Sequence, residues 1–366
     1  MVEWLAGNRL RGTSAEKPVS GLASPSVGGW VEVGRTTLGS AGDDIDVTGF
    51  ADKRYYMILM DTQPSGRTQW TQTVGNTTFD TGANYAFRFS VNGATDTATA
   101  NASSLEMGAE INALYTDPKF GVAYIANLSS KEKLMQSLVV AQNAASASTA
   151  PDRDENVSKW TNTSNPIDRF RLHNIETGSF NTGSEVVVLG WDPTDTHTTN
   201  FWEELASVDL SGGSADTLSS GTFTAKKYLW IQAYTTATGG TTNPYFRVGN
   251  TTLDTGSNYA IRYSTNGAAD STLTSQGNIP LDGVTLATGE SSLSNFFIIN
   301  NASNEKLIIH SSVESEAAGA AAAPSRIELA SKWVNTSNQI DIVGLNNVSG
   351  TGDFGTETMI KVWGSN

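Results

Sequence analysis

The feature that most constrains this chain is a long segment that occurs twice. Val74–Asp96 (VGNTTFDTGANYAFRFSVNGATD) matches Val248–Asp270 at 17 of 23 positions, with an offset of 174 residues. Ser158–Asp168 (SKWTNTSNPID) matches Ser331–Asp341 at nine of 11 positions, with an offset of 173. Solenoids and propeller blades repeat about every 20–50 residues, so a period this long indicates two homologous domains.

Weaker matches in the same order extend the two copies over most of the chain. One of them pairs Ile125–Leu134 (IANLSSKEKL) with Ile298–Leu307 (IINNASNEKL). The short polar stretch between the copies is typical of a linker. We therefore predict an N-terminal segment without a counterpart, a first domain, a linker and a second domain, at residues 1–28, 29–193, 194–199 and 200–366.

Each copy has the pattern of an all-β domain. Apolar and aromatic runs of strand length, such as Tyr55–Met60 and Tyr228–Tyr234, alternate with turn signals such as Asn92–Gly93. We count about seven or eight such strands in each copy, and no long 3.6-residue periodicity. The prediction is two tandem β-sandwich domains of jelly-roll type, preceded by an extended N-terminal arm.

Charge and cysteine content exclude several kinds of partner. The chain has 23 Lys and Arg against 37 Asp and Glu, a formal net charge of −14, and no cysteine. Binding to nucleic acid or to an anionic membrane needs clustered cations, so we expect neither partner. Disulfides and thiolate metal sites are excluded. The N-terminal sequence lacks the apolar run of a signal peptide, so we expect a protein made in the cytoplasm and not secreted by that route.

The sequence offers no convergent set of catalytic or metal-binding residues. The three histidines, His173, His197 and His310, have no counterparts in the other copy. The acidic turn at Gly42–Asp46 has oxygen ligands suited to calcium, but the matching segment of the second copy keeps a single Asp. We therefore predict no catalytic residue, no metal and no cofactor.

A DTG triplet occurs in each copy, at Asp80–Gly82 and Asp254–Gly256. This triplet is also an aspartic-protease signature, in which two carboxylates share one buried site. Here it lies in a polar Asn/Thr turn, and no hydrophobic strand leads into it. The context favours turn chemistry over catalysis.

Four aromatic residues recur at equivalent positions: Trp160 and Trp333 in SKW, and Tyr85 and Tyr259 in NYA. Exposed, such rings would be platforms for stacking against sugars; buried, they would anchor the core. Recurrence in both copies favours the core, because it indicates a need of the fold. Carbohydrate stacking stays open as the alternative.

Residues 1–28 combine apolar anchors with positive charge in an otherwise acidic chain. Too short for a core of its own, the segment is either a tail or a docking arm. We favour an arm that docks on a partner through Trp4, Leu5, Arg9, Leu10 and Arg11.

Several segments resemble a known group of proteins. Leu5–Lys17 (LAGNRLRGTSAEK) is similar to the opening of structural proteins of tailed viruses, especially marine ones. Further segments resemble a repeat domain that occurs singly or in tandem in those proteins: Trp30–Asp43, Asp80–Arg88, Lys131–Leu134, Ser158–Ser164 and Gly183–Pro193. The second copy departs from this pattern in its first and last strands.

The resemblance implies a β-sandwich protein of the virus particle. We expect a non-enzymatic structural protein on the virion surface: a capsid decoration, head-fibre or tail-fibre component. Its arm would bind capsid, portal or tail proteins, and it would form a homo-oligomer such as a trimer. Two alternatives stay open. One is a tandem carbohydrate-binding or receptor-binding module for a host-surface glycan. The other is a polysaccharide-acting enzyme, which needs paired carboxylates roughly 5–10 Å apart.

Overall fold

The computed structural model describes residues 29–107, 116–193, 195, 199–281, 285–317, 319–348 and 351–366, and the backbone alone of residues 3–5 and 9–11. Regular structure in these residues is entirely β, and the strands pair antiparallel. Over the same ranges, no helix has the length and apolar character needed to cross a membrane. The predicted all-β class is confirmed.

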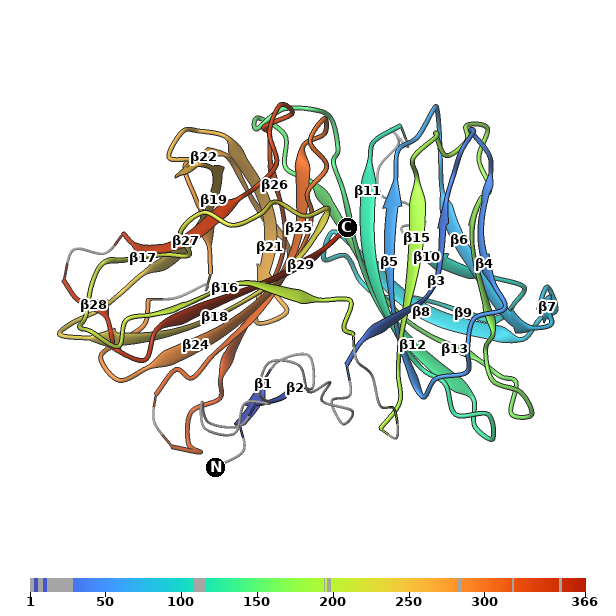
Figure 1. The fold of residues 1–366 in the computed structure, drawn as a ribbon, viewed down its shortest axis with the longest axis horizontal. Coiled ribbons are helices and arrows are strands. Elements are labelled where there is room, and N and C mark those ends of the chain that lie inside the picture. The colour runs from blue at the N-terminus through green and yellow to red at the C-terminus, as the bar shows by residue number, and fades with distance from the viewer. Residues whose placement is uncertain are drawn as a thin grey trace. The chain divides into compact units, whose positions relative to one another are not determined.

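The chain forms two compact units (Figure 1). Unit 1 comprises Met1–Ser90, Asp96–Val139 and Asp154–Trp202, and unit 2 comprises the remaining segments Val91–Thr95, Val140–Arg153 and Glu203–Asn366. Two segments of the first sequence copy are therefore grouped with unit 2. The domain limits derived from the repeat stay a prediction.

The first sequence copy builds two sheets. The larger has the order β3 (Val31–Thr37), β15 (Glu185–Trp191), β5 (Tyr55–Thr62), β11 (Lys119–Ala126), β12 (Lys133–Ala141), β13 (Asp152–Trp160), β8 (Tyr85–Val91) and β9 (Thr97–Ala102). The smaller has the order β10 (Leu105–Met107), β6 (Trp70–Asn76), β14 (Arg169–Asn174) and β4 (Asp44–Thr48), and β7 (Thr78–Phe79) pairs with β6.

The second copy repeats this strand order. Its larger sheet runs β16 (Glu203–Asp209), β29 (Met359–Ser365), β18 (Tyr228–Thr238), β24 (Ser291–Ile299), β25 (Lys306–Glu314), β26 (Ser325–Trp333), β21 (Tyr259–Thr265) and β22 (Ser271–Gln276), with β28 (Asp353–Phe354) against β18. The smaller runs β17 (Thr217–Ser219), β27 (Ile342–Asn347), β19 (Pro244–Asn250) and β20 (Thr252–Leu253), with β23 (Ile279–Pro280) against β19. The shared strand order agrees with the prediction of two homologous domains.

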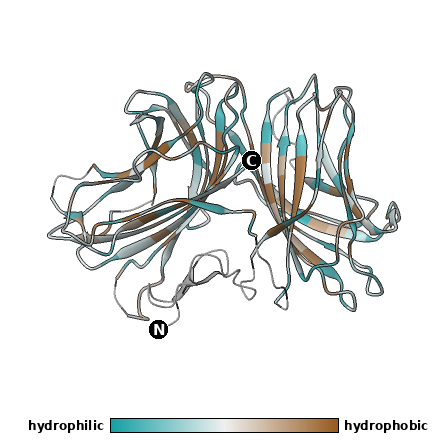
Figure 2. Cartoon of the chain, viewed as in Figure 1, coloured by the Kyte–Doolittle hydropathy of each residue, from teal (hydrophilic) through white to brown (hydrophobic). Residues whose placement is uncertain are grey.

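Each pair of sheets encloses a core, and Figure 2 shows hydrophobic residues concentrated on the strands. In unit 2, Ile231 of the larger sheet and Phe246 of the smaller sheet belong to one buried cluster. In unit 1, the indole N–H of Trp70 on the smaller sheet donates to the Thr62 hydroxyl on the larger sheet at 3.2 Å. Both copies are therefore β-sandwiches, as predicted.

The copies contain more strands than the seven or eight expected for each. The additional ones include β9 and β22, edge strands whose residues are small or polar and mostly exposed. Such strands have no buried face and therefore no apolar alternation. Their Thr- and Ser-rich sequences could not be distinguished from loops by pattern.

The N-terminal segment contains two short strands, β1 (Glu3–Leu5) and β2 (Arg9–Arg11), which pair antiparallel with Trp4 opposite Leu10. The side chains of the five predicted docking residues, and the rest of residues 1–28, lie outside the described part of the chain. The docking arm stays a prediction.

Candidate functional site

The repeated aromatic residues are buried. Trp160, Trp333, Tyr85 and Tyr259 each have at most 1% of their surface exposed. The indole N–H of Trp160 donates to Asp80 Oδ2 at 2.8 Å, and that of Trp333 donates to Asp254 Oδ2 at 2.7 Å. The alternative of sugar-stacking platforms is wrong for these four residues, because none presents a ring face to solvent. They anchor the core.

The DTG triplets form the turns that hold these anchors. Asp80 also accepts hydrogen bonds from Gly82 N at 2.9 Å and from the Asn84 amide at 2.9 Å. Burial opposes ionisation of Asp80, but the hydrogen bonds from Trp160, Gly82 and Asn84 lower the pKa of this carboxyl below its usual value. Asp254 accepts the matching hydrogen bonds, from Gly256 N at 2.8 Å and from the Asn258 amide at 2.9 Å. Each carboxylate is occupied by its own turn, as turn chemistry predicts.

The other candidate residues are also separated. His173 is exposed and lies 2.6 Å from Asp44, whereas His310 is buried and stacks on Phe296 with ring centroids 4.2 Å apart. His197 lies outside the described residues. In the acidic turn, Asp46 is bound by the Arg171 guanidinium. Nowhere in the described ranges do three acidic or histidine side chains converge as metal ligands.

A groove of about 420 Å³ lies on the outer face of the larger sheet of unit 1, opposite to the core. Strand pairing creates it. Tyr55 of β5 lies between Ala126 of β11 and Trp191 of β15 in one cross-strand row. Because side chains alternate along a strand, this row faces outward while the neighbouring Tyr56 faces the core, where its hydroxyl lies 3.1 Å from the Ile167 carbonyl.

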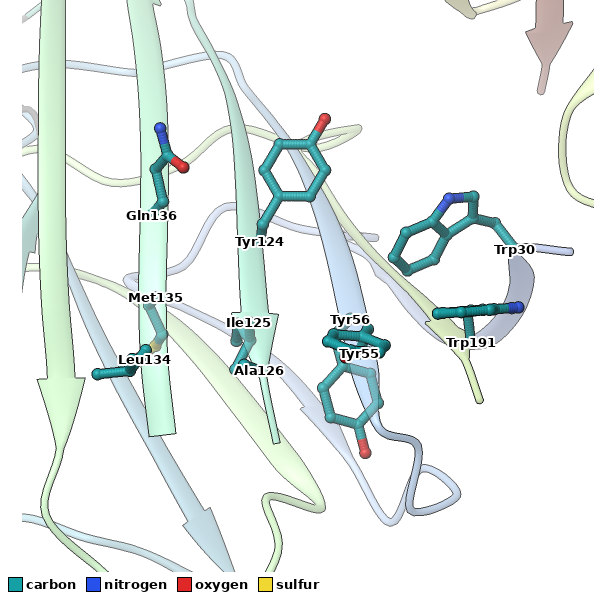
Figure 3. Close-up of a pocket in the computed structure, with 10 residues that line it drawn as sticks. All are labelled: Trp30, Tyr55, Tyr56, Tyr124, Ile125, Ala126, Leu134, Met135, Gln136 and Trp191. Carbon is teal, nitrogen blue, oxygen red and sulfur yellow. The ribbon is translucent and has the colours of Figure 1, made fainter. Parts of the chain in front are cut away.

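Aromatic rings form the floor and one wall of the groove. The rings of Tyr55 and Trp191 are near-parallel, with centroids 5.3 Å apart and planes 20° apart. Figure 3 shows this pair edge-on, with the rings of Trp30 and Tyr124 on the same side of it. All four side chains are only partly buried. The arrangement presents a flat apolar surface to a ligand.

The polar groups of the groove are uncharged. Its described lining residues include no Asp, Glu, Lys, Arg or His. Burial raises the pKa of the Tyr124 hydroxyl well above its usual range, so this group stays protonated at neutral pH. Gln136 adds an exposed amide with both donors and an acceptor. The site therefore suits an uncharged ligand that has an apolar face and hydroxyl groups.

Sequence reasoning missed these residues, although the strands that carry them were predicted. One available signal was the difference between the copies. Positions equivalent to Tyr55, Tyr124, Gln136 and Trp191 in the second copy are Tyr228, Phe297, Ile309 and Ser365. Only the first copy keeps the complete set. Repetition marked residues that the fold needs, and the groove consists largely of residues that are not repeated.

Comparisons with known proteins give little guidance. No protein-family model and no curated protein matches the sequence. Among solved structures, mouse laminin α1 chain domains LG4-5 are similar at 11% identity, covering 91% of this chain and 89% of that one, with a TM-score of 0.21. The attachment invasion locus protein Ail of Yersinia pestis is similar at 9% identity, covering 77% and 98%, with a TM-score of 0.10. Such low TM-scores carry no argument about function.

Proposed function

We propose that this is a non-enzymatic binding protein whose first sandwich holds an uncharged glycan in the aromatic groove. The near-parallel Tyr55–Trp191 pair, flanked by Trp30 and Tyr124, carries the proposal. Pyranose rings have apolar C–H faces that pack on aromatic surfaces, and their hydroxyls bind neutral donors and acceptors. The lack of carboxylates in the described lining supports binding rather than hydrolysis, because glycosidases use a carboxylate pair.

The experiment is binding to a panel of immobilised neutral oligosaccharides, with wild-type protein and the Trp191→Ala variant. We expect the variant to bind the glycans that occupy the groove at least about tenfold more weakly, since losing a ring platform removes about 1.4 kcal/mol or more. Val157→Ala is the control, because Val157 is 52% exposed and does not line the groove. Equal affinity of wild type and Trp191→Ala for every glycan would refute the proposal.

We further propose that the protein sits on the exterior of a virus particle, as a capsid decoration, head-fibre or tail-fibre component. The resemblance of Leu5–Lys17 and of the repeated domain motifs supports this location. Residues 1–28 would bind capsid, portal or tail proteins, and the groove would bind a host-surface glycan. Oligomerisation, for example as a trimer, would multiply weak contacts by raising the effective concentration.

A mass-spectrometric inventory of purified particles tests this second proposal. The protein should occur at a fixed copy number per particle that survives washing in high salt. Its absence from purified particles, combined with its presence in the lysate, would contradict the location and leave the glycan proposal standing.

A further inference from the structure

Unit 2 has a cleft of its own, with a volume of about 630 Å³. The end of β18 contributes Tyr234, Thr236 and Thr238. Thr288 and Gly289, which precede β24, line it as well, and so do Gly355 to Glu357, which precede β29. This cleft differs in chemistry from the aromatic groove.

Hydroxyl groups dominate the lining. Five come from Ser and Thr side chains, one from Tyr234, and the carboxylate of Glu357 is exposed. The Thr236 hydroxyl lies 3.5 Å from Glu357 Oε2, and the Thr288 hydroxyl donates to the Gly240 carbonyl at 3.0 Å. No Lys or Arg is among the described lining residues. The cleft therefore accepts hydrogen bonds readily and repels anions.

An exposed apolar strip borders this cleft. Strand pairing places Met359, Tyr234, Leu293 and Val313 in one cross-strand row over β29, β18, β24 and β25. Met359, Leu293 and Val313 are 37%, 46% and 44% exposed. Single exposed apolar residues are ordinary, but a row of four neighbours that includes an aromatic ring is a contiguous surface.

The strip belongs to the second copy alone. The equivalent row in the first copy contains Asp61, Phe120, Val140 and Glu185, all of which are at most 4% exposed. Glu185 there is bound by the Arg35 guanidinium at 3.1 Å. The two copies have therefore diverged on the outer face of the larger sheet. The first copy exposes the Tyr55–Trp191 pair, the second exposes the strip at Tyr234, and the equivalent positions of the other copy are buried or not aromatic.

We propose that the cleft of unit 2 is a second carbohydrate site, which takes a neutral or amino-bearing glycan. A pyranose face packs on Tyr234 and the adjoining strip. Ligand hydroxyl or ammonium groups donate to Glu357 and to the hydroxyls of Thr236 and Thr356. Glycans that carry sulfate or carboxylate are excluded by the negative lining. This site is independent of the aromatic groove and would make the chain bivalent.

The experiment compares four proteins: wild type, Trp191→Ala, the double variant Tyr234→Ala/Glu357→Gln, and the triple variant that combines all three substitutions. The probes are gluco-, manno- and galacto-oligosaccharides, glucosamine oligomers, and alginate as the anionic control. We expect Trp191→Ala to retain binding to a subset of neutral or glucosamine probes, and the triple variant to lose that binding at least tenfold. Alginate should bind to none of them. Thermal unfolding of the variants checks that both units stay folded.

Two outcomes would overturn this proposal. One is wild-type affinity of Tyr234→Ala/Glu357→Gln for every probe, and the other is complete loss of binding in Trp191→Ala. If Trp191→Ala binds like wild type while the double variant loses binding, the cleft is supported and the groove is refuted. A Leu293→Ser/Val313→Ser variant that changes the oligomeric state but no glycan affinity would assign the strip to protein contact and contradict its proposed role.

Discussion

At the scale of residues, the repeated motifs describe how the turns hold the core. Asp80 binds the buried Trp160 N–H and two groups of its own turn. Lys133 is buried beneath this region, donates to the Asn162 carbonyl at 2.7 Å, and lies 5.3 Å from the Trp160 ring centroid. Its counterpart Lys306 donates to the Asn335 carbonyl. The two copies within the sequence share these residues, because each sandwich requires the same local structure.

Asp80→Ala should destabilise unit 1 by about 1–3 kcal/mol, because it leaves the buried Trp160 N–H without an acceptor. Denaturant unfolding followed by tryptophan fluorescence measures the loss. The pKa of Asp80 is lowered in the folded protein, so its stabilising effect is present above the usual Asp pKa and is lost as the pH falls through the folded value. Asp96→Ala is the control, since Asp96 is an exposed residue. An equal effect of both substitutions would contradict the role of the turn.

His310 should make the second sandwich sensitive to acid. It is 2% exposed, neither ring nitrogen has a hydrogen-bond partner among the described residues, and its burial lowers the pKa from 6.5 to about 3. Between pH 6.5 and about 3, the imidazole of His310 is protonated in the unfolded chain but not in the folded protein. The free energy of unfolding therefore falls as the pH drops from 6.5 towards 3. His310→Phe should flatten this fall in a series of denaturant midpoints across that range. Parallel curves for wild type and variant would exclude His310 as the cause.

At the scale of elements, the two cores are filled differently by the same strands. In unit 1, Trp70 packs where a Cβ on Gly121 would lie 3.0 Å from its Cζ3 atom. The equivalent positions in unit 2 are Pro244 and Ser294. One row further along, unit 1 has the small or polar Gln72, Ala123 and Ser137. Unit 2 has Phe246, Phe296 and His310 there, in a continuous ring stack. The bulky side chains of the unit 2 core therefore lie one cross-strand row away from the position that Trp70 fills in unit 1.

Gly121→Ser, which copies the second core into the first, should destabilise unit 1 by about 1–3 kcal/mol through overpacking against Trp70 and Met60. The reverse change, Ser294→Gly, should cost about 1 kcal/mol or less, the usual effect of glycine inside a strand. Thermal unfolding of both variants makes the comparison. A stable Gly121→Ser protein with unchanged unfolding would contradict the account of the two cores.

The strands that the sequence predicted are those with a continuous run of apolar and aromatic residues, such as β5 and the first half of β18. Edge strands such as β9 were missed because their small, exposed residues have no periodic burial. The groove escaped for another reason. Tyr55 and Trp191 are 136 residues apart in sequence and meet only through the β5–β15 register. Cross-strand neighbours of this kind depend on sheet order, which no local pattern specifies.

At the scale of the whole molecule, duplication kept the strand order and changed the outer faces. The first copy exposes the Tyr55–Trp191 groove, and the second exposes the Tyr234 strip with its hydroxyl-lined cleft. If both cavities bind glycans as we propose, the chain would attach to a surface by several weak contacts. The arm at residues 1–28 would then link this binding body to the particle.

Deletion of residues 1–28 should abolish incorporation into particles while leaving the thermal stability of both units unchanged. The physical reason is that the arm carries apolar and cationic residues in an acidic chain and precedes the first sandwich copy. Copy number on purified particles and a melting curve give the two readouts. Incorporation of the truncated protein at the normal copy number would show that the arm is not the attachment device.

Glycan binding in the aromatic groove can be tested directly by a crystal structure of the protein soaked with the neutral oligosaccharide that it binds most tightly. We expect a pyranose ring over the Tyr55–Trp191 pair, with hydroxyls within hydrogen-bond distance of Tyr124 or Gln136. An oligosaccharide that binds in solution, yet leaves this groove unoccupied in a crystal where the groove is open to solvent, would contradict it.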